Sequence, residues 1–349
     1  MNNQSHIIKG TCYALCPEEE INLRERENLV HILEVVNKKH KLVKCFSRSA
    51  ADAHMAIPRL LRPFNILRDT VKHLLFVVAK RIDVPLAVMY DFLNDRLRAV
   101  RQDVTIQRLP PAQCLELLEP IIRFHVYFGY RLCEKPTNEF NPTLNKQYLL
   151  ECIKWFLSSI DELEKSKYNF DTTILNLELL KLDEKDKDYD RVLIESLYIL
   201  CNMDDETPMK RYLQLPKEIK RNPRLRLTYD IAISNLKGNY INVCRLYHRL
   251  CPLTACAFLT YLPVLQRRSL QKMSSAYNSK HLSIPTEVIQ EWLLFNSISE
   301  AAECCKHYGL SVNGGVCFNK SAFKHEADIH RLGNNQTAAQ ITLQDILTY

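Results

Sequence analysis

Apolar residues recur along this chain at spacings of three and four, the period of helices that bury one face. The clearest run lies between Pro85 and Gln107. Its apolar positions are Leu86, Tyr90, Leu93, Leu97, Val100 and Val104. At about 100° per residue these side chains share one face of a helix, so the pattern predicts a long helix that packs this face into a core.

The same spacing continues through most of the chain, with prolines and short polar stretches between the runs. Pro63 precedes a predicted helix from Phe64 to Val78, and Pro17 with three glutamates predicts a helix that continues through Leu33. Further helices are predicted over residues 114–134, 144–165, 191–202 and both halves of 229–250. Gly238 is expected to take the left-handed position between those halves. Short connections favour helical hairpins stacked in a row, with residues 183–190 as a charged connector.

The last third has a different pattern. A helix over residues 264–277, a second helix ending at Leu294 and a third helix capped by Ser297 and Glu300 are predicted. Gly309 should end the third helix, and the turn at Asn313 and Gly314 predicts a β-hairpin. The fold class is therefore mainly α: helical-hairpin repeats of the PCI or TPR kind, followed by a C-terminal winged helix.

Four regions follow from these patterns. Residues 1–54 form an N-terminal segment that packs on the repeats, and residues 55–262 form the helical repeats. Residues 263–325 form the winged helix, and residues 326–349 form a polar C-terminal tail.

Composition argues against the enzymes that can be recognised by motif. Seven glycines in 349 residues leave little room for phosphate-binding loops, and GxGxxG, GxxxxGK[ST], HExxH and GxSxG are absent. Thirteen scattered cysteines form no CxxC zinc frame and suggest a reducing compartment. The apolar runs are too short for a membrane span of about 20 residues. No catalytic residue, metal or cofactor is expected, and His125 on an apolar helix is interpreted as a core residue.

Charge is unevenly distributed. Residues 35–109 hold fifteen Lys or Arg against six Asp, a net +9, whereas residues 160–206 have a net charge of −8. Such polarity would steer a polyanion or an acidic partner toward one side.

Three arginines lie on the long predicted helix. Arg98 falls on its polar side and is a candidate for partner binding, whereas Arg101 lies closer to the apolar stripe and is interpreted as a structural cation. The alternative for Arg96, Arg98 and Arg101 is a solvated flank with Asp91, Asp95 and Asp103 as local ion partners.

Other basic side chains could contact an anion. Arg59 and Arg62 precede a helix start, where a cation opposes the helix dipole and suggests a compensating anion. Arg267, Arg268 and Lys272 on the first helix of the predicted winged helix could contact phosphate, or they could be solvated surface. The third helix of that region carries Glu300 and Glu303 beside its basic residues, so sequence-specific DNA recognition is not expected.

Several motifs resemble the SAC/GANP-domain family, named for the germinal-centre-associated nuclear protein. They are GTCYALCPEEE at 10–20, VKCFSRSAA at 43–51, LRPFNIL at 61–67, DRLRAVRQDVTIQ at 95–107, LKGNYINVCRLYHRL at 236–250 and QRRSLQKMSSAY at 266–277. The resemblance runs from Gly10 to Phe323. Asp52 stands where the family commonly has glycine.

The resemblance implies a PCI-like scaffold without catalytic activity. Large members organise a complex that couples transcription to messenger RNA export at the nuclear pore. Their winged helix pairs with a PCI subunit that carries a small acidic peptide, and the paired basic surface can hold RNA or other single-stranded nucleic acid. The resemblance assigns Arg267, Arg268 and Lys272 to that surface, and it makes Arg96, Arg98 and Arg101 mainly architectural.

The resemblance leaves the cellular role open. The flanking regions through which long members bind the export receptor and centrin are not expected here, and a compact member of the family is linked to centrosome duplication and spindle assembly. Two functions therefore remain: a scaffold in export, at the centrosome and spindle, or both, and a nucleic-acid-binding module. The expected location is the nucleus at the pore, the centrosome and spindle, or both.

Overall fold

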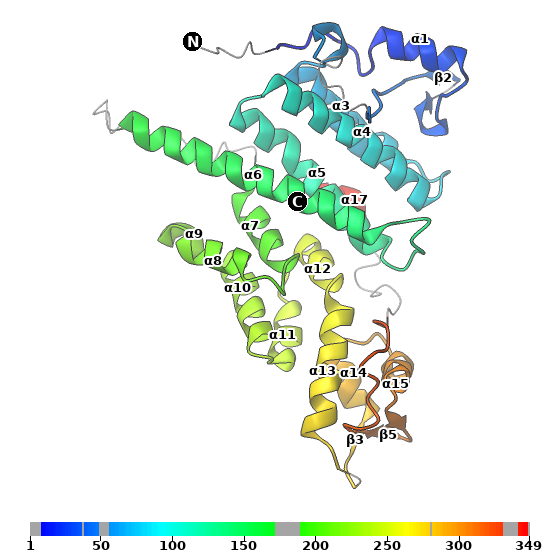
Figure 1. Cartoon of the computed structure of the whole chain (residues 1–349), viewed down its shortest axis with the longest axis vertical. Helices are drawn as coiled ribbons and strands as arrows, with labels where there is room; N and C mark the ends of the chain where they lie inside the picture. The colour runs from blue at the N-terminus through cyan, green and yellow to red at the C-terminus, as the bar shows by residue number, and fades with distance from the viewer. Residues whose placement is uncertain are drawn as a thin grey trace. The chain divides into compact units, whose positions relative to one another are not determined.

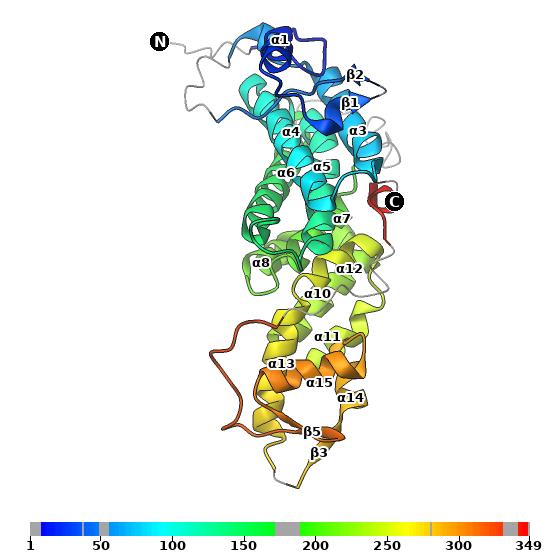
Figure 2. The same cartoon turned by 90° about the vertical axis from the view of Figure 1, so that its right-hand side faces the viewer.

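The computed structural model describes residues 8–36, 38–48, 56–171, 189–279, 281–330 and 341–347, with side chains up to residue 166 in the third range. The protein is mainly helical and has two small sheets (Figures 1 and 2). It divides into two compact units, residues 1–125 with 138–189 and residues 126–137 with 190–349. Asp52 and nearly all of the predicted connector at 183–190 lie outside the described residues. The four predicted regions stay predictions.

The first unit contains helices, short 3₁₀ turns and one small hairpin. The α-helices are α1 (Glu18–Arg26), α3 (Phe64–Phe76), α4 (Leu86–Gln107), α5 (Pro111–Arg131), whose last residues belong to the second unit, and α6 (Pro142–Asp171). The 3₁₀ turns are η1 (Ile32–Glu34), η2 (Pro58–Leu60) and η3 (Val78–Lys80), and strands β1 (Val35–Val36) and β2 (Lys39–His40) pair as a hairpin.

Helix α4 matches the range predicted from its apolar spacing. Leu86 is partly buried, and the other five predicted positions, at 90, 93, 97, 100 and 104, are buried. The helix also has a second buried stripe, at Phe92, Arg96, Ala99, Asp103 and Gln107. Polar residues on this stripe suggested an exposed face, but the N-terminal segment covers it.

The first helix is shorter than its predicted extent. The prediction carried it through Leu33, but α1 ends at Arg26. Asn28 adopts a left-handed conformation with φ of 52°, and the Leu29 N–H donates to the Arg24 carbonyl at 2.8 Å. This is a Schellman ending, for which Asn is an accepted substitute for Gly. The chain then turns into η1 and the β1–β2 hairpin.

The second unit has a helical part and a mixed part. The helices of the first part are α7 (Arg191–Leu200), α8 (Thr207–Gln214), α9 (Lys217–Lys220), α10 (Pro223–Leu236), α11 (Tyr240–Tyr247) and α12 (Pro252–Leu259). The mixed part contains α13 (Leu262–Ala276), β3 (Ser283–Pro285), α14 (Thr286–Leu293), α15 (Ile298–His307), β4 (Ser311–Val312) and β5 (Gly315–Cys317). A last short helix, α17 (Leu343–Leu347), follows.

The predicted hairpin at 229–250 corresponds to α10 and α11. Gly238 has φ of 72°, which confirms its left-handed position, and the Asn239 N–H donates to the Ser234 carbonyl at 2.8 Å. The Asn239 side chain then accepts from the Asn242 N–H and caps α11. A glycine followed by an N-cap asparagine therefore closes one helix and starts the next.

The mixed part follows the predicted element order and adds one strand. Ser297 accepts from the Glu300 N–H at 3.1 Å, and Gly309, with φ of 84°, follows the end of α15. The hairpin predicted at Asn313 and Gly314 joins β4 to β5, with Gly314 at φ of 70°.

Strand β3, which the sequence pattern did not predict, pairs with β5, so the sheet order is β3-β5-β4. Its three residues are too few for an alternation signal.

Candidate functional site

A buried carboxylate joins three segments of the first unit. Asp103 on α4 accepts from the Lys44 ammonium at 2.6 Å and from Arg62 Nε at 2.7 Å. Asp103 and Arg62 are fully buried, and Lys44 is nearly so. One turn further along α4, the Gln107 side chain accepts from the Gly10 N–H at 2.8 Å and donates to the Arg62 carbonyl at 2.8 Å.

These contacts correct the assignment of Arg62 to a partner surface. The anion suggested by its position before a helix is Asp103 of the same chain, and no external ligand can reach a guanidinium that is fully buried. Arg59 remains exposed and pairs with Glu19. The two arginines that looked alike in the sequence therefore have different environments.

A second buried carboxylate, Glu34 at the end of η1, contacts the same stripe of α4 through Arg96. Glu34 accepts from Arg24, from the Val43 N–H at 2.9 Å and from Arg96 at 3.4 Å. Burial by itself raises the pKa of Glu34. The hydrogen bonds from Arg24 and Val43 and the charges of Arg96 and Arg24 outweigh burial, so the pKa of Glu34 is lowered from 4.5.

Several charged residues of the sequence motifs are ion partners of these two carboxylates, Glu34 and Asp103. The buried ion pairs form two clusters, one around each carboxylate, which fasten the described residues of the N-terminal segment to α4. We call their six residues the ionic latch: Arg24, Glu34, Lys44, Arg62, Arg96 and Asp103. The expectation that Asp103 is a local partner of the α4 arginines is wrong. Its partners are Lys44 and Arg62.

The three arginines of α4 have separate environments. Arg96 is buried against the Phe92 ring and pairs with Asp95 and Glu34. Arg98 is partly exposed, and its guanidinium lies 3.8 Å from the centroid of the Phe46 ring and 4.9 Å from that of Tyr148. Arg101 donates to Glu151 at 2.8 Å. Only Arg98 keeps a surface that another molecule could reach without breaking an ion pair described here.

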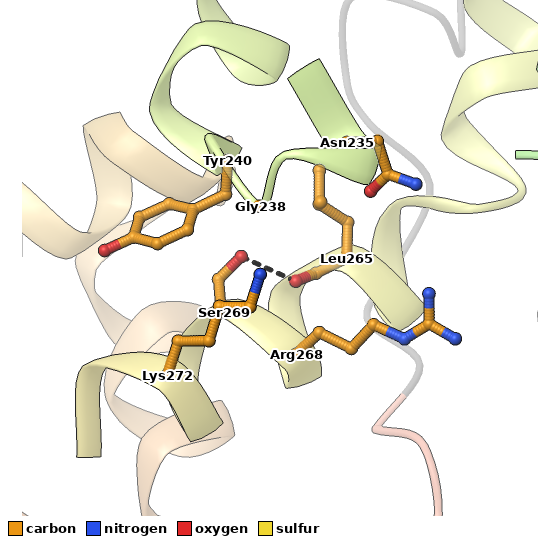
Figure 3. Close-up of a pocket in the computed structure, with 7 residues that line it drawn as sticks. All are labelled: Asn235, Gly238, Tyr240, Leu265, Arg268, Ser269 and Lys272. Carbon is orange, nitrogen blue, oxygen red and sulfur yellow. Dashed lines mark hydrogen bonds between the residues drawn. The ribbon is translucent and has the colours of Figure 1, made fainter. Parts of the chain in front are cut away.

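In the second unit, Arg268 and Lys272 lie one turn apart on α13. Arg268 donates to the Tyr261 hydroxyl at 2.8 Å and pairs with Asp204. Lys272 is exposed, and its ammonium lies beside Gly238, where a Cβ would approach it to 2.1 Å. Both side chains line a shallow pocket of about 100 Å³ together with Asn235 and Tyr240 of the α10–α11 hairpin (Figure 3).

Arg267 lies on a different face of α13. Its guanidinium donates to the His325 carbonyl, and Gln271, one turn later, contacts the His325 ring at 3.2 Å. The three basic residues that the sequence grouped are therefore divided: Arg268 and Lys272 face the pocket, and Arg267 faces the chain that follows the sheet.

That following segment, residues 318–330, packs on α13 and α15 and was missed by sequence reasoning. Phe323 is buried and stacks on Tyr308 with ring centroids 5.5 Å apart. The His330 N–H donates to the Tyr308 hydroxyl at 3.0 Å, and His307 contacts the Asp328 carbonyl at 2.8 Å. Residues 326–330, predicted as the start of a polar C-terminal tail, contact the mixed part through Asp328 and His330. The only sequence signal was the pair Phe318 and Phe323 among polar residues.

Four thiols and one histidine are shielded from solvent by burial. Burial raises the pKa of the thiols at 45, 244, 256 and 305 to about 12, which keeps them protonated and unreactive. His125, whose pKa is lowered by burial to about 4, contacts the Asn145 side chain at 2.8 Å. Its interpretation as a satisfied core residue agrees with this contact.

Within the described ranges, no group of three or more His, Cys, Asp or Glu is placed to hold a metal ion. In the same ranges no helix combines the length and the apolar character that crossing a bilayer requires. The pocket beside α13 is smaller than the roughly 300 Å³ at which small-molecule sites begin.

The fold is mainly helical, and the described residues include exposed basic side chains and a small pocket beside α13. The SAC3/GANP family model matches residues 15–314, and the chain belongs to this family. The match confirms the resemblance drawn from the motifs, and it spans the ionic latch, the α10–α11 hairpin and most of the mixed part.

Relatives share this region at modest identity. The chain is similar to Protein xmas of Drosophila melanogaster (27% identity, 90% of this chain) and to SAC3 family protein 1 of Schizosaccharomyces pombe (26%, 96% of this chain). It is also similar to SAC3 family protein B of Arabidopsis thaliana (27%, 84% of this chain). The chain spans 15%, 34% and 17% of the lengths of these three relatives.

Proposed function

We propose that this protein is a non-enzymatic scaffold in nuclear messenger RNA export that docks a PCI-type partner. The observation that carries the proposal is the SAC3/GANP family match over residues 15–314. The stacked helices then act as PCI-like repeats, and residues 262–317 act as the winged helix that holds the partner.

The order of elements supports the winged-helix interpretation. Three helices and a three-stranded antiparallel sheet alternate as α13-β3-α14-α15-β4-β5, with β5 between β3 and β4. They enclose a core of their own around Ile289, Leu293, Cys305 and Tyr308. On the outside, Leu282 before β3 is 42% exposed and Ile298 at the start of α15 is 45% exposed. Exposed aliphatic side chains on the mixed part, which has its own core, are suited to binding another protein.

The partner test uses affinity capture of the tagged chain together with two variants. We expect a PCI-domain protein, with its small acidic peptide, to be recovered by the wild-type chain. Leu282→Asp with Ile298→Asp should reduce that recovery, because a charge would be buried in the interface. The matched control is Leu144→Asp on α6 of the other unit, where the side chain is 45% exposed. Recovery of no PCI-domain protein, or equal loss in the control, would overturn the proposal.

The site of action is tested by location. A fluorescent copy expressed at its natural level should mark the nuclear rim in interphase if the chain serves export. Concentration at the spindle poles without a rim signal would instead place it in centrosome duplication and spindle assembly.

A second candidate function is direct binding of single-stranded nucleic acid. The observation in its favour is the pocket at α13, where exposed Lys272 and half-exposed Arg268 face the same side. Arg98, partly exposed between Phe46 and Tyr148, adds a cation beside aromatic rings in the first unit. Stacking rings and cations are the elements from which such surfaces are built.

A further inference from the structure

Exposed aliphatic side chains gather in the first unit around η1, the β1–β2 hairpin and the end of α3. Ile82 is 99% exposed, and Leu29, Ile32, Val36 and Val77 are between 41% and 61% exposed. We call these five residues the aliphatic patch. A fully exposed isoleucine contributes nothing to the core of its own chain, whereas several such side chains together often mark an interaction surface.

Hydrogen bonds from Arg81 bring members of the patch together. The Arg81 guanidinium donates to the Ile32 carbonyl at 2.8 Å and to the Val35 carbonyl at 3.2 Å, which holds the loop bearing Ile82 beside η1 and β1. The pKa of His73 on α3 is lowered mainly by burial and also by the charge of Lys41, so Lys41, just after β2, lies close to α3. His73 precedes Val77 by one helical turn. The hairpin therefore lies beside α3 (Figure 2).

The rim of the patch is basic. Lys38, Lys39, Lys41 and Lys80 are exposed, and none of the four forms an ion pair with another described residue. Asp83 pairs with Arg81, and Glu25 contacts His40, which carries a charge only when it is protonated. The patch thus combines an aliphatic centre with a rim of four exposed lysines.

We propose that the aliphatic patch docks an acidic amphipathic segment of a partner protein. Such a segment would place its apolar face on Ile82 and its neighbours and its carboxylates on the four lysines, which complements both features. All the exposed apolar side chains here are aliphatic, whereas surfaces that bind lipid usually carry Trp or Tyr at the interface, so a protein segment is favoured. This surface lies in the other unit from the proposed winged helix and does not depend on the proposed function.

The test uses a defined peptide and the full chain. The probe is a fluorescent helical peptide with leucines at three- and four-residue spacing and glutamates on its other face. We expect saturable binding by fluorescence anisotropy that weakens as salt rises. Ile82→Ser should weaken binding roughly tenfold or more, because one buried aliphatic side chain contributes about that factor. Lys38→Glu with Lys39→Glu should weaken binding similarly.

Controls separate this surface from general stickiness. Leu213→Ser and Lys217→Glu change exposed residues of the second unit and should leave the affinity unchanged. A peptide of the same composition in scrambled order, and one with lysine in place of glutamate, should not bind. Binding that is unaffected by Ile82→Ser would overturn the proposal. So would binding to phosphatidylserine vesicles, sensitive to Ile82→Ser, without binding to the peptide.

Discussion

Arg62 and Asp103 are both fully buried and are joined by an ion pair of 2.7 Å, although 41 positions separate them. Lys44 shares the same carboxylate at 2.6 Å. One buried anion thus compensates two cations, and Arg62 Nη2 has no hydrogen-bond partner among the described residues. The stability of this cluster therefore depends more on Asp103 than on either cation. Loss of one cation leaves one ion pair, whereas loss of Asp103 leaves two buried cations without an anion.

Asp103→Ala is therefore expected to be among the most damaging single changes in the first unit. Removing one partner of a buried pair costs about 3–5 kcal/mol, and here two cations lose their anion. The measurement is urea unfolding, with hydrogen exchange to locate the loss in the first unit. Asp83→Asn is the control, because that carboxylate is exposed and its pair with Arg81 is screened by water. Equal stability of the two variants would contradict the structural role assigned to Asp103.

Acid is expected to loosen the N-terminal segment through Glu34. Its pKa is lowered in the folded state, so its contribution to stability is fully present above the ordinary value of 4.5 and is lost as pH falls through the folded pKa. Hydrogen exchange of residues 10–48 as a function of pH should show faster opening below about pH 4.5.

Glu34→Gln keeps the shape of the side chain and removes its charge. This variant should be less stable at neutral pH, and the part of the pH dependence that belongs to Glu34 should disappear. If wild type and variant lost stability in parallel as pH fell, another carboxylate would be responsible.

The apolar spacing predicted the helices well because burial of one face leaves a regular signal. It predicted α4 within a residue and the α10–α11 hairpin with its glycine. It failed where charges are buried: Arg62 was expected to contact an anion of a partner and Asp103 to lie on a solvated flank, whereas the two residues pair with each other in the core. The second stripe of α4 was visible as Phe92, Arg96, Ala99, Asp103 and Gln107 at spacings of four, three, four and four, but its polar members suggested solvent.

The sequence grouped three basic residues of α13 that the structure divides. Arg267 and Arg268 are adjacent in sequence, yet adjacent residues on a helix are about 100° apart and face different neighbours, whereas Lys272 lies one turn after Arg268. Asp204 and His325, which hold two of the three, lie 64 and 58 positions away. Such partners are set by tertiary packing, for which local periodicity carries no signal.

Gly238→Ala and Gly314→Ala should destabilise the chain by similar amounts. Both glycines have φ near 70°, so each alanine carries a backbone penalty of about 1–2 kcal/mol. A Cβ at Gly314 meets nothing within 4 Å. A Cβ at Gly238 would lie 2.1 Å from the Lys272 ammonium, but this group is the end of a flexible, exposed side chain that can move aside at little cost. Thermal unfolding of the two variants measures both costs. A clearly larger loss for Gly238→Ala that is restored by adding Lys272→Ala would contradict this expectation and show that Lys272 is held in place.

If the α13 surface binds nucleic acid, Lys272 should contribute more to it than Arg268 or Arg267. The charge of Arg268 is compensated by Asp204, and its guanidinium also donates to the Tyr261 hydroxyl. The Arg267 guanidinium donates to the His325 carbonyl. The logarithm of the affinity for a single-stranded RNA falls as the logarithm of the salt concentration rises, and each phosphate contact adds about 0.7 to the steepness of that fall. Lys272→Ala should therefore make the fall less steep by about 0.7, and Arg268→Ala should change it by less. Lys217→Ala, an exposed lysine on α9, is the control. A chain carrying Arg267→Glu, Arg268→Glu and Lys272→Glu that bound RNA as tightly as wild type would remove α13 from consideration, and the partly exposed Arg98 would be the next cation to test.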